Sequence, residues 1–90
     1  MKRQTFNSVW DALEDTKAEA MNMRIRSALM TDIANHIKEQ GWGQKEASER
    51  LGLTQPRVSD LVRGKIDKFS LDALVNMVSA MGLDVEIKVA

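Results

Sequence analysis

Residues 44–64 read QKEASERLGLTQPRVSDLVRG. Its apolar spacing predicts two short helices, the first over Gln44–Leu51 and the second over residues 55–63. Gly52 lies in the turn between them, where a positive φ is needed and costs a glycine little. Pro56 falls in the first turn of the second helix, where its missing N–H is tolerated. The stretch therefore has the form of a helix-turn-helix.

Side-chain sizes within this stretch suit two crossing helices. Ala47 and Ser48 are small at the point where the second helix is expected to cross the first. The Ser48 hydroxyl is expected to bond back to a carbonyl one turn earlier. Four apolar residues should hold the two helices together: Leu51, Leu53, Val58 and Leu61. The outer face of the second helix keeps mostly long polar side chains: Gln55, Arg57, Ser59, Asp60 and Arg63. Such a helix can enter a major groove and present its N-terminal residues to base edges.

The chain before this stretch predicts two further helices. Asn7 and Ser8 are good helix caps and begin a short helix that ends near Asp15. Thr16 and Glu19 form a capping box, which predicts that a long helix starts there and runs to Gln40. Apolar residues recur every four positions along the long helix, at Met21, Ile25, Leu29, Ile33 and Ile37, and Ala28, Met30 and Ala34 widen that stripe. Gly41 supplies the left-handed end.

After residue 64 the period of the apolar residues changes once. Ser70 caps a helix that Gly82 ends, with five inward residues: Leu71, Leu74, Val75, Val78 and Met81. Beyond it, Leu83, Val85, Ile87 and Val89 alternate with charged residues, which is typical of a half-buried strand. The expected organisation is an N-terminal extension over residues 1–22, a helix-turn-helix domain over 23–82 and a C-terminal strand over 83–90.

Composition excludes several classes of protein. Ninety residues make one small domain. The absence of cysteine excludes disulfides, thiolate zinc sites and a cysteine nucleophile, and a single histidine excludes sites that need several imidazoles. An enzyme is not expected, because no glycine-rich phosphate loop and no poised acid–base pair is visible. No cofactor and no metal are expected. No membrane span or signal peptide is visible in the sequence, so a cytoplasmic location is expected.

The balanced charge conceals an uneven distribution. Thirteen basic and thirteen acidic residues give a net charge of zero. Residues 44–68 hold six basic and four acidic side chains, whereas residues 69–90 hold one basic and three acidic ones. Residues 1–22 carry a net charge of minus one and residues 23–43 of plus one. A basic middle between acidic ends suits a chain with one face for a polyanion.

The motif residues resemble those of the Cro/cI-type (XRE) regulators. The resemblance lies in Gln44, the small pair, the turn glycine, and Gln55, Val58 and Leu61 at the expected offsets. The segments LGLTQPRVSDLVRGKI, FSLDAL and GLDVEI resemble a subfamily of short XRE proteins that includes HigA-type antitoxins, and NSVWDAL resembles its N-terminal extension. The resemblance implies a mainly all-α, lambda-repressor-like domain of four to five helices with a short C-terminal β-strand. Two departures are Ser48, where Ala is usual, and Pro56, which removes a backbone donor to phosphate.

The resemblance also implies a function, which is sequence-specific DNA binding as a dimeric transcriptional repressor. Autorepression of a toxin–antitoxin operon follows from the same resemblance. A protein-binding module whose main role is neutralising a toxin, and a free-standing repressor without a toxin, remain alternatives. Ten residues are candidates for DNA binding: Gln44, Thr54, Gln55, Pro56, Arg57, Ser59, Asp60, Arg63, Lys65 and Lys68.

Base contacts are expected from the start of the second motif helix. Gln55 can bond adenine and Arg57 can bond guanine through paired hydrogen bonds, with a phosphate contact as the alternative for either. Arg57→Ala is accordingly expected to relax selectivity at one position. Ser59 is a weaker candidate on the same face. Asp60 is expected to orient Arg57 or Arg63, or to accept from cytosine.

Phosphate contacts are expected around that helix. The resemblance implies that Gln44, at the start of the first motif helix, touches a phosphate and braces Gln55, and helix N-termini do attract anions. Thr54, Arg63, Lys65 and Lys68 are expected to bind phosphates, which would make affinity fall steeply with salt.

Two further surfaces are expected to bind proteins. Because one recognition helix reads few base pairs, a homodimer is expected, with the strand pairing through Val85, Ile87 and Val89. Pairing of that strand with residues 2–6 of its own chain is the alternative. Trp10 and Glu14 are the candidates for binding a small basic toxin, with Met21 and Met23 as the methionines most suited to a binding surface.

Overall fold

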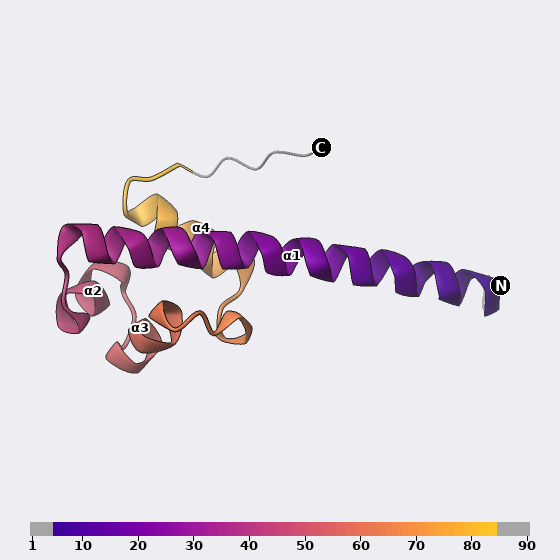
Figure 1. The fold of residues 1–90 in the computed structure, drawn as a ribbon, viewed down its shortest axis with the longest axis horizontal. Coiled ribbons are helices and arrows are strands. Elements are labelled where there is room, and N and C mark those ends of the chain that lie inside the picture. Colours follow the sequence, from indigo (N-terminus) through magenta and orange to yellow (C-terminus); the bar gives the residue numbers. More distant parts are fainter. Residues whose placement is uncertain (1–4, 85–90) are drawn as a thin grey trace.

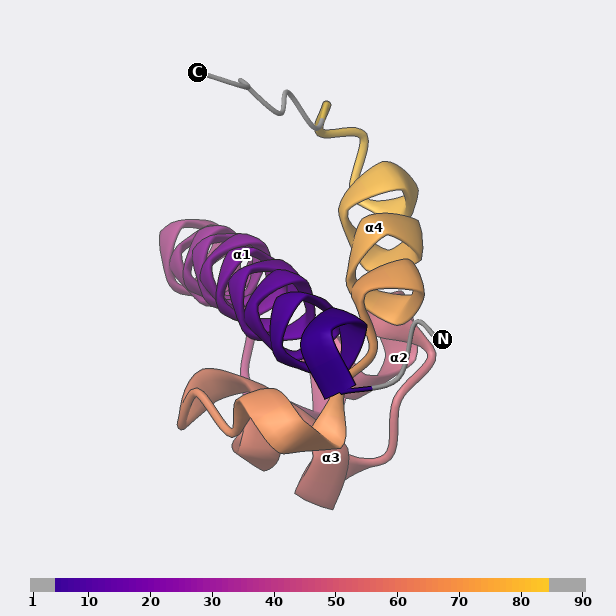
Figure 2. The same cartoon turned by 90° about the vertical axis from the view of Figure 1, so that its right-hand side faces the viewer.

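The structure is a computed structural model that describes the backbone of residues 5–84 and the side chains of residues 16–84. Its elements are helices α1 (Thr5–Gln40), α2 (Gln44–Leu51), α3 (Gln55–Val62), the 3-10 turn η1 (Ile66–Lys68) and α4 (Leu71–Ala80). The described part is thus all-α, with four α-helices and no strand. In Figure 1, α2, α3 and η1 lie on one side of the C-terminal half of α1, and α4 lies behind it. Figure 2 looks along α1 and shows α4 beside it and α3 below.

Helix α1 is one continuous helix of 36 residues, so the predicted break between a helix ending near Asp15 and a second one starting at Thr16 was wrong. The capping-box pattern TKAE marks a helix start only where the preceding chain departs from helical geometry. Here residues 5–15 are already helical, and neither glycine nor proline interrupts the sequence before Gly41. At 1.5 Å per residue such a helix is about 54 Å long. The longest axis of the molecule is also 54 Å, so α1 sets its length.

Among the described side chains of α1, those that join the core begin at Ile25. Leu29, Ile33 and Ile37 are buried and Ile25 is partly buried, as the four-residue stripe predicts. Met21 continues the same stripe but is 50% exposed, because α3, η1 and α4 pack only against the later turns. Ala28 is exposed as well, so its predicted place in the core was wrong. Residues 16–24 are exposed throughout, and this half of the helix extends beyond the rest of the domain (Figure 1).

Helix α4 packs against α1 and contributes its apolar side chains to the core. The Ser70 hydroxyl accepts from the Ala73 N–H at 3.1 Å, which confirms the predicted cap. Leu74 and Val78 are buried as predicted, and Met77, which the sequence did not single out, is buried too. Leu71, Val75 and Met81 are partly buried, and Phe69 completes this part of the core.

The predicted C-terminal strand falls mostly outside the described residues. Gly82 has a φ of 76° and ends the region of α4, as expected. Leu83 then donates its N–H to the Val78 carbonyl at 3.1 Å, and neither Leu83 nor Asp84 is in a strand. Val85, Ile87 and Val89 lie beyond the described part, so their pairing remains a prediction.

Candidate nucleic-acid interface

The turn between α2 and α3 has the predicted glycine conformation. Gly52 is left-handed, with φ 67° and ψ 32°, and its N–H donates to the Ser48 carbonyl. The Leu53 N–H donates to the same carbonyl at 3.0 Å. Ala47 is completely buried, as expected for the small residue where α2 is crossed. The helix-turn-helix geometry over residues 44–62 is therefore present.

Ser48 closes this turn with its side chain. Its hydroxyl donates to the Leu53 carbonyl, not to a carbonyl one turn earlier as predicted. Within a helix the earlier carbonyl already accepts a backbone N–H. The Leu53 carbonyl lies in the turn, outside the helical ladder, and is within reach of the hydroxyl. Ser48 thus ties the end of α2 to the residue before the cap of α3.

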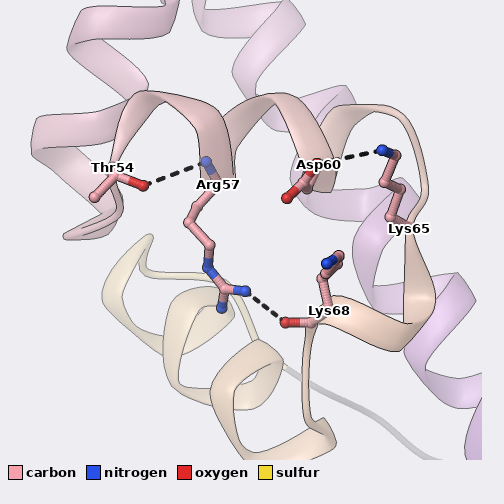
Figure 3. Close-up of polar contacts among 5 residues, drawn as sticks. All are labelled: Thr54, Arg57, Asp60, Lys65 and Lys68. Carbon is pink, nitrogen blue, oxygen red and sulfur yellow. Dashed lines mark hydrogen bonds and ion pairs between the residues drawn. The ribbon is translucent and has the colours of Figure 1, made fainter.

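Helix α3 begins with a capped first turn. Thr54 has the extended conformation of an N-cap, and its hydroxyl accepts from the Arg57 N–H at 3.4 Å (Figure 3). Pro56 stands in the first turn, where α-helices tolerate it. The Thr54 hydroxyl therefore serves the start of α3, and Thr54 remains exposed at that end.

One side of α3 is in the core and the other is open to solvent. Val58 and Leu61 are 2% and 1% exposed. The exposed residues of α3 and its C-cap are Gln55, Pro56, Val62 and Arg63, and the half-buried ones are Arg57, Ser59 and Asp60. Val62, at 54%, is an apolar side chain on the open face. The polar outer face predicted from the sequence is therefore accessible at its N-terminal end.

Besides Thr54, three of the predicted DNA-binding side chains are engaged within the chain: Arg57, Asp60 and Lys65. The Arg57 Nη1 donates to the Lys68 carbonyl at 2.6 Å, and its guanidinium carbon lies 4.3 Å from the centre of the Phe69 ring. Asp60 pairs with the Lys65 ammonium at 3.7 Å, and not with Arg57 or Arg63 as expected. Figure 3 shows both contacts crossing from α3 to the segment that follows it. Asp60 and Arg57 therefore connect α3 to residues 64–69.

The other basic side chains predicted to bind phosphate follow the C-terminal end of α3. Arg63 caps the C-terminal end of the helix and is exposed. The Lys65 side chain is 49% exposed although it pairs with Asp60, and Lys68 is exposed in η1. These three cations stand at the C-terminal end of α3 and along the segment that follows it.

Gln44 occupies the first position of α2. The cap residue before it, Gly43, provides no side-chain acceptor, so N–H groups of this first turn remain available to an anion. Gln44 is exposed. No hydrogen bond joins it to Gln55 among the described residues, so the expected bracing of Gln55 is absent here.

Sequence reasoning missed Arg26. Its Nη1 donates to the Ile66 carbonyl at 3.0 Å and to the Phe69 carbonyl at 3.3 Å, while its Nε donates to the Asn22 Oδ1 at 2.6 Å. These backbone partners lie 40 and 43 residues further along the chain. Nothing local to Arg26 signals them, because only the packing of η1 on α1 brings the groups together.

The two residues predicted to bind a toxin lie outside the described side chains. Trp10 and Glu14 belong to α1, but their side chains lie outside the described ones. Among the described residues, no cluster of histidine, aspartate and glutamate side chains is suited to hold a metal. No described helix has the length and hydrophobicity that crossing a membrane would require.

Helix α3 is capped, is joined to α2 by a glycine turn, and exposes a polar face to solvent. These features define a helix-turn-helix protein. A family model described as a helix-turn-helix domain matches residues 12–90. No curated protein matches the chain. A solved structure named "Putative XRE Family Transcriptional Regulator" superposes with a TM-score of 0.72 at 30% sequence identity, covering 80% of this chain and 81% of that chain. The protein belongs to the XRE family of helix-turn-helix regulators, which bind DNA and are not enzymes.

Proposed function

We propose that this protein is a sequence-specific transcriptional repressor that reads its operator with α3. The open face of α3 carries the proposal. Gln55 and Arg63 are exposed at its two ends while Val58 and Leu61 hold it to the core. A helix held in this way can enter a major groove, which is about 12 Å wide, without unfolding any part of the domain.

Base readout is proposed for the N-terminal half of this face. Gln55 is exposed and follows the cap directly, so its amide can reach a base edge and pair with adenine through two hydrogen bonds. Ser59 lies one turn later and is half-buried, which suits a contact at shorter reach. Pro56 would contribute apolar surface next to Gln55. Asp60 pairs with Lys65 through Oδ1, and its other carboxylate oxygen would accept from cytosine.

Phosphate contacts are proposed for the groups that surround α3. Gln44 and Thr54 stand at the N-terminal ends of α2 and α3, and Arg63, Lys65 and Lys68 at the other end and beyond. Each phosphate neutralised by a cation contributes a slope of about −0.9 to the plot of log affinity against log salt. Arg57 belongs to the proposed interface as well, and it contacts the Lys68 carbonyl and the Phe69 ring.

A homodimer is proposed because one α3 reads too few base pairs for useful selectivity. Two copies would place their recognition helices in successive major grooves, about 34 Å apart. The predicted strand pairing would hold the two copies together. It would join Val85, Ile87 and Val89 to the same residues of the second copy.

Selection from a randomised duplex library, followed by footprinting on the enriched duplex, tests this function. We expect an enriched sequence with two half-sites about ten base pairs apart, protected on one side of the duplex. Enrichment of a single unpaired half-site would contradict the dimer. Failure to enrich any sequence would contradict sequence-specific binding altogether.

A second candidate function is the antitoxin role, and the projecting half of α1 favours it. Met21 and Met23 are 50% and 47% exposed on this projection. Residues 7–23 hold four acidic side chains and one basic one, a net charge of minus three. An exposed helix with apolar side chains and negative charge suits a small basic protein, and Trp10 and Glu14 lie in this stretch.

Co-expression with the product of the adjoining gene tests the antitoxin role. If that gene encodes a small basic protein, the pair should co-purify. The charge-bearing variant Met21→Asp should weaken the complex, while Asn76→Asp in α4 serves as the matched control. A complex that tolerates both Met21→Asp and removal of residues 1–20 would contradict toxin binding at this helix. A free-standing repressor would then be the remaining interpretation.

A further inference from the structure

The segment that follows α3 is held between two arginines. Arg26 of α1 donates to the carbonyls of Ile66 and Phe69, and Arg57 of α3 donates to the carbonyl of Lys68. The Phe69 ring is 2% exposed and anchors the segment in the core. Three carbonyls within four residues therefore accept from side chains of two different helices. This arrangement fixes where η1, and with it Lys68, stands relative to α3.

The contacts that Arg57 makes within the chain compete with base readout. Its guanidinium stacks on the Phe69 ring at 4.3 Å and donates to the Lys68 carbonyl at 2.6 Å, and one side-chain conformation satisfies both contacts. Figure 3 shows the side chain leaving α3 toward Lys68. To reach a base, Arg57 would have to give up the stacking and the charge-assisted hydrogen bond together. Among the described residues, no other group donates a hydrogen bond to the Lys68 carbonyl.

We propose, on the basis of the DNA-binding function above, that Arg57 is a positioning residue. It stays on Phe69 and the Lys68 carbonyl in the complex and places the Lys68 ammonium beside α3 for a phosphate contact. Arg57 holds the main chain of Lys68 and leaves its side chain free, and that side chain is exposed. The consequence is that Arg57 contributes to affinity for every duplex and not to the choice of one base pair.

Nuclear magnetic resonance on the intact chain tests the position of Arg57 directly. The Arg57 guanidinium carbon lies 4.3 Å from the centre of the Phe69 ring. We therefore expect the ring current to shift the guanidinium protons, and those on the neighbouring Cδ, upfield of their values in the urea-unfolded chain. We expect this shift to persist when the duplex enriched by selection is added to saturation. Loss of the shift in the complex would show that Arg57 leaves the ring, and would overturn the proposal.

A double-mutant cycle tests whether Arg57 acts through Lys68. Lys68→Ala keeps the carbonyl that Arg57 bonds and removes the side chain beyond Cβ, including the ammonium. Arg57→Ala should weaken binding several-fold in the parent chain and much less in the Lys68→Ala chain. Lys65→Ala is the matched control background, because Lys65 pairs with Asp60 and Arg57→Ala should keep its full effect there. Equal effects of Arg57→Ala in both backgrounds would contradict positioning of Lys68.

The selectivity of the Arg57→Ala variant separates the two roles. For a positioning residue, affinities for the enriched duplex and for its single-base-pair variants fall by the same factor. A loss confined to one base pair would assign Arg57 to base readout and overturn the proposal. If instead the parent chain enriches no duplex, the DNA-binding function itself fails, and this outcome is distinct from either result for Arg57. Unfolding curves of each variant correct the affinities for any unfolded fraction.

Discussion

Ser48 shows at the scale of one residue how a hydroxyl shapes this motif. It connects the last turn of α2 to the Leu53 carbonyl, so the turn is closed by a side chain as well as by backbone hydrogen bonds. An intramolecular hydrogen bond contributes about 1 kcal/mol to stability. Replacing Ser48 by Ala removes that bond and gains roughly half as much through better helix propensity.

The Ser48→Ala variant is therefore expected to be less stable than the parent, and Ser79→Ala to be unchanged or slightly more stable. Ser79 is exposed in α4, and only the propensity gain applies there. Urea unfolding monitored by circular dichroism measures both. Two variants of equal stability would mean that the hydroxyl of Ser48 contributes nothing to the turn.

Gln55 and Lys65 differ in the kind of DNA contact proposed for them. Gln55→Ala should lose roughly 1–3 kcal/mol of discrimination at one base pair, as expected for a residue that pairs with adenine. Lys65→Ala should weaken all duplexes alike and reduce the salt slope by about 0.9. Binding titrations on the enriched duplex and its single-base variants, at several salt concentrations, distinguish the two. If Gln55→Ala lowers all affinities equally, Gln55 is a phosphate contact.

Local signals explain which elements were predictable from the sequence. The bounds of α2 are as predicted and those of α3 and α4 differ by one or two residues, because caps and left-handed glycines mark them within the sequence itself. The continuous α1 was not predictable from the TKAE pattern. Lys17, Ala18 and Glu19 are good helix formers, so the same residues also fit a helix interior that tolerates one threonine. The contacts of Arg57 with Lys68 and Phe69 span eleven residues or more, and no local pattern encodes them.

The two glycines that flank α2 allow a matched test at the scale of the element. Gly43 is the N-cap with φ −74°, whereas Gly52 ends the helix with φ 67°. A Cβ would meet nothing within 4 Å at either position, so only backbone conformation distinguishes them. Gly43→Ser should raise the free energy of unfolding by about 0.5–1 kcal/mol through capping and reduced chain entropy. Gly52→Ser should lower it by about 1–2 kcal/mol, the cost of a left-handed conformation.

Denaturant unfolding of both variants measures these changes. An unchanged stability for Gly52→Ser would mean that the turn can adopt a right-handed conformation. A loss for Gly43→Ser would mean that the hydroxyl does not reach the N–H groups of the first turn of α2.

At the scale of the whole molecule, α1 serves two separate purposes. From Ile25 onward it supplies the central stripe of the core, whereas residues 16–24 are exposed and project from the domain (Figure 1). An isolated helical segment of this length is marginal in water. The projecting half therefore adds helix content but little to the stability of the domain. It also leaves the basic region around α3 accessible to DNA.

Deleting residues 1–20, so that Met21 becomes the first residue, tests this division. The deletion keeps Asn22, which bonds Arg26, and every side chain that is buried among the described residues 16–84. We expect the free energy of unfolding to change by no more than about 0.5 kcal/mol, as for surface changes, and affinity for the enriched duplex to be retained. Deleting residues 1–26 is the matched control. It removes Ile25 from the core and Arg26 from the carbonyls of Ile66 and Phe69, and should lower both stability and DNA affinity. If the shorter deletion already lowers them, the projecting half of α1 supports the DNA-binding domain and is not a separate surface for a partner.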